Sequence, residues 1–215
     1  MDDLLCIVPL RSPGAGKTRL SPLLSRAERA ALSGAMLADV VHALRGAGLD
    51  RIVVAASGDA AAAAASALGC DVHIDPDDVD TLDGALAAAA GRHAAPGDDV
   101  LVVQADLPLL TPADVHALVA TDAPVVVAPT LDGGTSALLR RPGAVIGTSY
   151  GPASARCHLD LADAAGVRHA LVERAGLATD VDTPDDLHGL RAAAVGTATR
   201  CVLDHLGELS QPRRR

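Results

Sequence analysis

The stretch VLVVQAD at residues 100–106 decides the fold, because four consecutive apolar residues run into a polar turn that ends in a carboxylate. A strand without polar alternation is typical of a sheet that helices cover on both faces, as in parallel sheets. The segments Leu4 to Val8, Ile52 to Ala56 and Val125 to Ala128 are apolar in the same continuous way. The pattern therefore predicts a largely parallel sheet between two layers of helices.

Helical segments separate these strands. From Arg26 to about Leu44 apolar residues recur at helical spacing, and Ser25 with Glu28 forms a capping-box pattern. Further helices are expected at Asp59 to Leu68, at Asp83 to Ala94 and from Pro112 onward with Thr111 as its cap, and a further strand at Asp71 to Ile74. Strands that alternate with helices indicate a doubly wound α/β arrangement over residues 1–130.

The rhythm changes after Pro129. The segments expected there are a short strand at Ser136 to Leu139, a helix at Pro152 to Ala165, a strand at Val167 to Val172, a helix opened by Asp180 to Pro184 and running to about Ala194, and a helix at Gly196 to Leu209. This break predicts a mixed sheet with an antiparallel excursion. We expect one domain over residues 1–215, since 215 residues with 49% hydrophobic content fit one large core.

Composition excludes several classes of protein. The formal net charge is −9, and Tyr150 is the only aromatic residue, so neither a basic footprint nor stacking platforms for nucleic acid are present. No basic-then-apolar leader and no apolar run of membrane-spanning length are seen. The four cysteines form no C-x-x-C pair, and a reducing cytoplasm is the simplest compartment. Arg213 to Arg215 read as a solvated tail, and the sequence is compatible with a homodimer.

The loop after the first strand runs from Arg11 to Arg19 and holds three cations and two glycines. Gly16-Lys17-Thr18 is reminiscent of a Walker A loop, but that motif needs glycine where Arg11 stands, which disfavours a P-loop kinase. Ligands of open α/β sheets bind beyond the carboxyl ends of strands, so the loop suits a triphosphate. Lys17 is the only lysine in the chain.

Carboxylates follow in two places. Asp106 stands at the end of the most apolar strand, where it could hold a metal ion on a ligand. Asp180 and Asp182 precede a helix that Thr183 caps, and alternate residues of an extended segment share a face. One of these two aspartates could meet Asp106 across a bound cation.

Glycines and hydroxyls combine in two further segments. Gly133-Gly134-Thr135 is the first, and the second, Tyr150 to Arg156, includes Gly151 and Ser154 and opens a helix. Helix N-termini bind anions through free N–H groups, so Thr135 and Ser154 could hold a phosphate or carboxylate. Turn chemistry and an N-cap explain these residues equally well.

Taken together, four segments resemble one family. The segments are Lys17 to Pro22, Ala105 to Pro108, Gly133 to Thr135 and Asp180 to Pro184, in the order found in the 2-phospho-L-lactate and phosphoenolpyruvate guanylyltransferases of coenzyme F420 biosynthesis. Tyr150 to His158 is similar to that family's second substrate segment. The resemblance implies a single-domain GT-A-like Rossmann nucleotidyltransferase fold, with residues 1–130 binding nucleotide, 131–195 binding the acceptor, and 196–215 forming a C-terminal helix and tail.

The resemblance also implies substrates and roles. It implies that GMP passes from GTP to phosphoenolpyruvate or 2-phospho-L-lactate, with Mg²⁺ as cofactor. The implied residues are Asp106 and Asp182 for the metal; Lys17, Arg19 and Asp106 for catalysis; Arg11, Lys17, Ser57 and Asp83 for the nucleotide; and Thr135, Gly151 and Ser154 for the acid. Asp83 stands where the family often has asparagine. The alternatives are another nucleotidyltransferase of this fold, of the molybdenum-cofactor type, and a non-catalytic GTP-binding protein.

Overall fold

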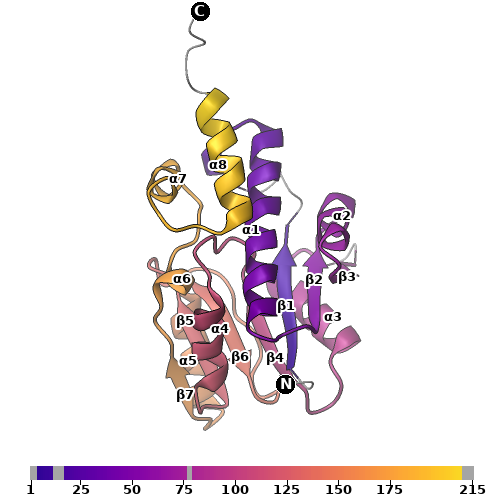
Figure 1. Cartoon of the computed structure of the whole chain (residues 1–215). Coiled ribbons are helices and arrows are strands. Elements are labelled where there is room, and N and C mark those ends of the chain that lie inside the picture. The colour runs from indigo at the N-terminus through magenta and orange to yellow at the C-terminus, as the bar shows by residue number, and fades with distance from the viewer. Residues whose placement is uncertain (1–3, 12–16, 77–78, 210–215) are drawn as a thin grey trace, which may run out of the picture.

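A computed structural model of the chain describes residues 4–11, 17–76 and 79–209, with side chains to residue 206 (Figure 1). Two segments on which the sequence carried predictions lie outside the described residues. They are the glycine-containing part of the loop, residues 12–16, and the arginine tail, residues 213–215.

The core of the molecule is a seven-stranded mixed sheet with the order β3-β2-β1-β4-β6-β5-β7. The strands are β1 (Leu4–Leu10), β2 (Ile52–Ala56), β3 (Asp71–Ile74), β4 (Asp99–Val103), β5 (Val125–Pro129), β6 (Thr135–Arg140) and β7 (His169–Leu171). Strand β6 runs antiparallel to both of its neighbours, β4 and β5, while the other pairs are parallel. The predicted mixed sheet with an antiparallel excursion is therefore confirmed.

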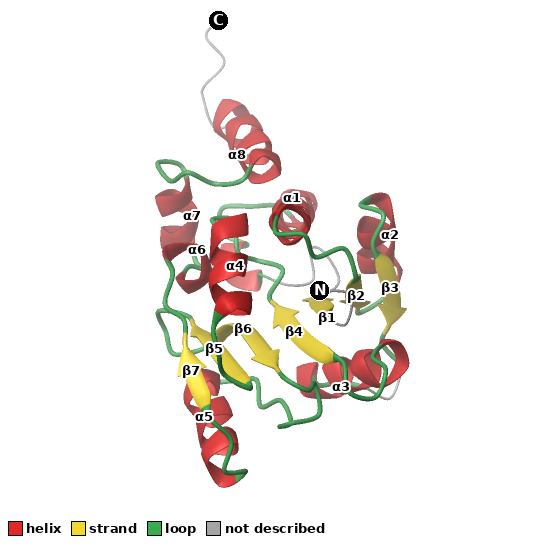
Figure 2. Ribbon diagram, turned by 60° about the horizontal axis from the view of Figure 1, so that its bottom comes forward, coloured by secondary structure: helices red, strands yellow, loops and turns green. Residues whose placement is uncertain are grey.

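Helices cover both faces of the sheet (Figure 2). On one face pack α1 (Arg26–Gly46), α2 (Asp59–Ala67), α4 (Pro112–Ala120) and the short α6 (Ala175–Ala178), and on the other face α3 (Leu82–His93) and α5 (Ser154–Ala164). Strand β1 shows why the runs are apolar throughout. Cys6 and Val8 belong to one core cluster and Leu5 and Ile7 to the other, so both faces of the strand are buried, and only Pro9 is partly exposed.

Strand β1 continues to Leu10, two residues beyond the predicted end at Val8. Cys6 donates its backbone N–H to Arg51, and Leu10 accepts from Ser57, so the even-numbered residues of β1 bond to β2. The backbone nitrogen of Pro9, which carries no hydrogen, therefore faces the β4 side. The pairing of β1 with β4 has already ended at Ile7, so no donor is needed there. The proline costs no ladder bond and does not end the strand.

Local capping sets where the helices begin. The Ser25 hydroxyl accepts from the Glu28 N–H in a complete capping box, and Thr111 caps α4 with Pro112 in its first turn, both as predicted. Helix α3 begins at Leu82 rather than at the predicted Asp83, because the Thr81 hydroxyl accepts from the Gly84 N–H.

A third group of elements lies against the outer side of α1. It comprises η1 (Thr18–Leu20), α7 (Pro184–Leu190) and α8 (Thr197–Leu209), and α8 runs beside α1 (Figure 1). Helix α7 ends four residues before the predicted Ala194. The carbonyls of Arg191 and Ala193 accept instead from the Arg200 guanidinium, and the chain turns into α8. Among the described residues, no helix combines the length and apolarity needed to cross a bilayer.

Candidate active site

The candidate site lies at the carboxyl ends of the parallel strands. Strand β1 has β2 on one side and β4 on the other, so the chain reverses its direction of travel between β1 and β4, and ligands of open α/β sheets bind at such a switch point. Arg11 follows β1, Ser57 follows β2 and Asp106 follows β4. The topology thus gathers three residues that lie far apart in the sequence.

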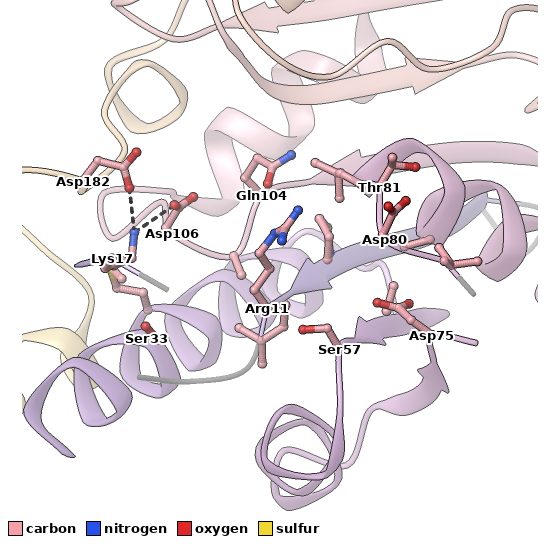
Figure 3. Close-up of a pocket in the computed structure, with 18 residues that line it drawn as sticks. Arg11, Lys17, Ser33, Ser57, Asp75, Asp80, Thr81, Gln104, Asp106 and Asp182 are labelled. Atoms are coloured by element: carbon pink, nitrogen blue, oxygen red, sulfur yellow. Dashed lines mark hydrogen bonds and ion pairs between the residues drawn. The ribbon is translucent and has the colours of Figure 1, made fainter. Parts of the chain in front are cut away.

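A cavity of about 410 Å³ opens at this point (Figure 3). Arg11 and Ser57, two of the residues predicted to bind the nucleotide, are among its lining residues, and Lys17, Asp106 and Asp182 lie together at one end. The opposite end and the walls are formed by Asp75, Asp80 and Thr81, with Gln104, Ser33 and apolar residues such as Met36, Leu82 and Ala85. An elongated cavity with cations and hydroxyls along it suits a nucleoside triphosphate.

Lys17 joins the two predicted metal ligands. Its Nζ lies 2.9 Å from Asp106 Oδ2 and 3.4 Å from Asp182 Oδ1, and it donates to the backbone carbonyl of Val181 at 2.6 Å. The side chain is only 9% exposed. Carboxylates from two distant segments therefore converge on a single positive charge.

The conformation and charge of Lys17 both point to a functional constraint. Its φ of 53° lies in the left-handed region, which costs a non-glycine residue about 1–2 kcal/mol. Burial alone would lower the pKa of the ammonium, but the charges and hydrogen bonds of Asp106 and then Asp182 outweigh it, and the pKa is raised above its ordinary value. Lys17 is therefore a fixed cation at neutral pH.

A second cavity, of about 230 Å³, adjoins the first. It brings together Thr135, Gly151 and Ser154, the three residues predicted to bind the acid. Thr135 reaches this edge because β6 is antiparallel: its first residues lie beside the end of β4, where Gln104 N–H donates to the Ser136 carbonyl at 2.8 Å. A parallel strand in this place would put its first residues at the opposite edge of the sheet.

The two cavities share part of their walls. Asp106 and Asp182 line both of them, and so do Gln104 and Leu82. Asp180 lines only the second cavity. Of the two aspartates that the sequence left open as partners of Asp106, Asp182 is therefore the one that stands between the cavities.

The second cavity is strongly acidic. Asp106, Asp132, Asp180 and Asp182 line it, and no lysine, arginine or histidine does among the described residues. Burial, together with the charges of Asp106, Asp182 and Asp132, raises the pKa of Asp180 to about 6. The carboxylates thus outnumber the cations on this side of the site.

Two predicted site residues lie outside both cavities. Arg19 is exposed, and its charge acts on Asp132, whose pKa is lowered chiefly by the Thr130 hydroxyl and the Gly134 N–H. Asp83 accepts from the backbone N–H of Tyr150 at 3.0 and 3.2 Å and so ties α3 to the segment before α5. The catalytic role predicted for Arg19 and the nucleotide contact predicted for Asp83 stay predictions, and the contact of Asp83 is with Tyr150, a lining residue of the second cavity.

The N-terminus of α5 differs from the open anion site that the sequence suggested. The Ser154 N–H donates to the Gly151 carbonyl and the Ala155 N–H to the Gly133 carbonyl. The first amides of the helix are therefore already engaged. What the helix offers to the cavity is the side chain of Ser154, whose hydroxyl donates to Thr135 Oγ1 at 2.9 Å.

Sequence reasoning missed Gln104, Asp75 and Asp132 as lining residues. Gln104 and Asp75 follow the ends of β4 and β3, and the rule that located Asp106 also applies to them. Asp132 belongs to the turn between β5 and β6, and no local pattern distinguishes it from a solvated loop aspartate.

A family model described as "Guanylyl transferase CofC like" matches residues 4–214. The chain belongs to the CofC-like guanylyl transferase family. This resemblance was expected from the sequence and is confirmed. Membership in a nucleotidyltransferase family suggests a need for a divalent metal ion. Among the described residues, no group of three or more histidine, cysteine, aspartate or glutamate side chains forms a ready-made metal site.

Named relatives of this CofC-like chain are guanylyltransferases that differ in the acid they are named for. A phosphoenolpyruvate guanylyltransferase from Nocardia farcinica is 37% identical, covering 97% of this chain and 96% of the relative. A 2-phospho-L-lactate guanylyltransferase from Methanothermobacter thermautotrophicus is 35% identical, covering 97% and 93%. A 3-phospho-D-glycerate guanylyltransferase from Phenylobacterium zucineum is 35% identical, covering 93% and 95%.

Solved structures similar to the CofC-like chain agree on the fold. A protein from Desulfovibrio desulfuricans described as a nucleotide-diphospho-sugar transferase superposes with a TM-score of 0.74 at 20% identity, covering 97% of each chain. A CMP:2-keto-3-deoxy-manno-octonic acid synthetase superposes with a TM-score of 0.60 at 18% identity, covering 88% of this chain and 97% of the other. The predicted nucleotidyltransferase fold is confirmed.

Proposed function

We propose that this protein transfers the GMP group of GTP to the phosphate of a small phosphorylated carboxylic acid and releases pyrophosphate, in coenzyme F420 biosynthesis. Its family and its named relatives support guanylyl transfer. Phosphoenolpyruvate and 2-phospho-L-lactate are the acids expected from the sequence, and 3-phospho-D-glycerate joins them because a relative of similar identity is named for it.

One observation carries the proposal: the cavity that holds Arg11 and Lys17 and the cavity that holds Thr135 and Ser154 meet at Asp106 and Asp182. A direct transfer needs the reacting atoms of donor and acceptor to approach within about 3–3.5 Å. Two substrates that occupied these cavities would face one another across the shared wall. The α-phosphate of the nucleotide would then lie beside Asp106, with the base toward Asp75 and Asp80.

The residues at the junction fit a magnesium ion. Mg²⁺ is usually held by one or two carboxylates together with substrate phosphates, and Asp106 and Asp182 already share one positive charge in the Lys17 ammonium. The second cavity also carries four carboxylates, so an anionic acid needs additional positive charge in order to enter it. When bound there, Mg²⁺ would neutralise phosphate charge as a Lewis acid.

The reaction requires no general base from the protein. A phosphate oxygen of the acid is already an anion; it forms the new bond to the α-phosphorus, while the bond to the β-phosphate oxygen breaks and pyrophosphate leaves with the electron pair. Lys17 stays protonated and supplies a fixed positive charge beside the departing phosphates. Arg11 and Ser57 would orient the nucleotide, and Thr135, Gly151 and Ser154 the acid.

The transfer can be tested with the purified protein, Mg²⁺ and each acid in turn. We expect pyrophosphate and a product whose mass equals the acid plus one guanylyl group, with GTP and not with ATP, CTP or UTP. Product formation from CTP would instead indicate a nucleotidyltransferase of the molybdenum-cofactor type. GTP binding without pyrophosphate release, with all three acids, would indicate a non-catalytic GTP-binding protein.

The junction itself can be tested with Asp106→Asn, which keeps the shape of the side chain and removes its charge. We expect kcat to fall by about a hundredfold or more, because the site loses one of its two metal-binding carboxylates. Asp185→Asn is the control, since Asp185 is an exposed aspartate of α7 that lines neither cavity. Turnover close to that of the wild type in Asp106→Asn, with thermal unfolding unchanged, would refute the metal assignment.

We further propose that the protein works in the cytoplasm. All four cysteines are free, which fits a reducing compartment. Recovery of the protein in the cytosolic fraction of cells would support this placement, and recovery with the envelope would contradict it.

A further inference from the structure

The acceptor cavity is backed by a buried histidine that lines neither cavity. His158 of α5 is completely buried. It stands four residues after Ser154, so both side chains extend from the same face of the helix toward β6. His158 Nδ1 lies 3.1 Å from Thr135 Oγ1, and its Nε2 accepts from the backbone N–H of Ser149 at 2.9 Å. Both ring nitrogens therefore have partners.

The contact with Ser149 fixes the position of the ring proton. A backbone N–H can only donate, so Nε2 must present its lone pair, and the proton of a neutral ring then stands on Nδ1. Burial, helped by the charge of Arg140 and opposed by that of Asp83, lowers the pKa of His158 to about 4. The Tyr150 ring packs edge-on against the imidazole, with 5.0 Å between the two ring centroids. The ring is neutral near pH 7, and Nδ1–H donates to Thr135.

The Thr135 hydroxyl consequently receives two hydrogen bonds. His158 Nδ1–H donates to Oγ1, and so does the Ser154 hydroxyl at 2.9 Å. A hydroxyl has two acceptor positions and one proton, so its acceptor capacity is used up. No oxygen of the described residues takes the Thr135 proton, and the residue borders the acceptor cavity.

We propose that His158 is a positioning residue that locks the Thr135 hydroxyl as a hydrogen-bond donor to an anionic oxygen of the phosphorylated acid. The inference rests on the proposed function for the identity of that acid. It explains how a cavity lined by carboxylates can still recognise an anion. Without His158, one acceptor position of Oγ1 would be open, and the hydroxyl could present that lone pair to the ligand.

This donor matters because three neighbouring backbone donors are already engaged. The N–H groups of Ser154 and Ala155 bond to carbonyls, and the Gly134 N–H bonds to Asp132. The locked hydroxyl is thus a selective contact: it favours a carboxylate or phosphate oxygen over a donor such as an amide nitrogen.

Two variants of His158 separate its two contacts. Asn places an amide nitrogen two bonds from Cβ, as Nδ1 is, so His158→Asn keeps a donor for Thr135 and loses the acceptor for Ser149. Gln places an amide oxygen three bonds from Cβ, as Nε2 is, so His158→Gln keeps the acceptor and loses the donor. Both variants leave a neutral polar side chain in the same buried site.

We expect His158→Gln to raise KM for the acid about tenfold or more, with KM for GTP nearly unchanged, and His158→Asn to raise KM for the acid much less. Thr135→Val, which removes the hydroxyl, should raise KM for the acid more than Thr135→Ser, which keeps it. If His158→Asn and His158→Gln changed KM for the acid and KM for GTP by the same factors, His158 would be only a packing residue, and the inference would be overturned.

A second measurement does not depend on activity. The ¹⁵N chemical shifts of the His158 ring in the free wild-type protein at pH 7 should show the Nδ1–H tautomer, and titration with phosphoenolpyruvate should leave that tautomer unchanged. A spectrum of the Nε2–H tautomer would overturn the inference even in a fully active enzyme. Absence of transfer to all three acids, with the Nδ1–H tautomer present, would count against the proposed function alone.

Discussion

At the scale of single residues, the acceptor side of the site depends on a contact between two hydroxyls. Ser154 and Thr135 are 19 positions apart in the sequence, and their oxygens lie 2.9 Å apart in a buried setting. Each is held by a different element, α5 and β6. A change in this pair can therefore affect both the docking of α5 on β6 and the binding of the ligand.

Ser154→Ala tests this pair. The change removes one hydroxyl from the cavity and one of the two donors to Thr135, so we expect KM for the acid to rise about tenfold while KM for GTP changes little. Steady-state kinetics with each substrate varied in turn will measure both constants. Ser66→Ala, at an exposed serine of α2, is the matched control. Equal increases in the two KM values would move Ser154 out of the acceptor site.

The site residues that could be predicted from the sequence are those that lie directly at the end of a strand or at the start of a helix. Asp106 ends an apolar strand, and Ser154 begins a helix, so a general rule finds them. Gln104 follows the same rule and was overlooked. His158 could not be found in this way, because its contacts with Thr135 and Ser149 exist only after α5 has docked on β6.

At the scale of elements, the C-terminal helix is attached to α1 through a buried carboxylate. Asp39 of α1 is buried, and its two carboxylate oxygens accept the N–H groups of Ala198 and Thr199 at 3.0 and 2.8 Å. A carboxylate there satisfies amides at the start of α8 and favours its dipole. Gly196 fits beside this contact because a side chain in its place would overlap the Asp39 carboxylate.

The same packing supports the site loops. A cluster of apolar side chains joins Leu203 of α8 to Leu20 and Val181, which are both fully buried. Leu20 follows the Lys17 turn by three residues, and Val181 directly precedes Asp182. Helix α8 therefore helps to hold the two segments whose charges meet at the junction of the cavities.

Leu203→Ala should weaken this support. Removal of a buried leucine side chain costs about 2–5 kcal/mol of stability, and we expect KM for GTP to rise more than KM for the acid, because Lys17 lines only the nucleotide cavity. Denaturant unfolding and steady-state kinetics will measure the two effects. Cys201→Ala is the control, as an exposed position of the same helix. A loss of stability with both KM values unchanged would limit α8 to a scaffold role.

The order of the large elements was predictable, since each has a clear apolar period or a capping residue. The short ones were not. The segments η1 and α6 have three and four residues, too few to show a helical period. The antiparallel direction of β6 was indicated only by the change of rhythm after Pro129. That direction nevertheless decides the site, because it brings Thr135 to the carboxyl ends of β1 and β4.

At the scale of the whole molecule, an acidic protein must bind two anionic substrates. The formal net charge is −9, and four aspartates border the acceptor cavity. The chain keeps its single lysine at the junction of the two cavities, where its pKa is raised. A protonated ammonium is a poor nucleophile, so the structure favours direct transfer between two bound substrates over a covalent nucleotidyl-lysine intermediate.

This arrangement predicts a sequential kinetic mechanism. Because the cavities adjoin, both substrates can be bound before transfer, so double-reciprocal plots with GTP varied at several fixed acid concentrations should intersect. Without acid, GTP should release no pyrophosphate, and labelled pyrophosphate should not exchange into GTP. Parallel lines together with exchange in the absence of acid would require a covalent guanylyl-enzyme. Lys17, enclosed by Asp106, Asp182 and the Val181 carbonyl, would then have to leave its partners and lose its proton before every turnover.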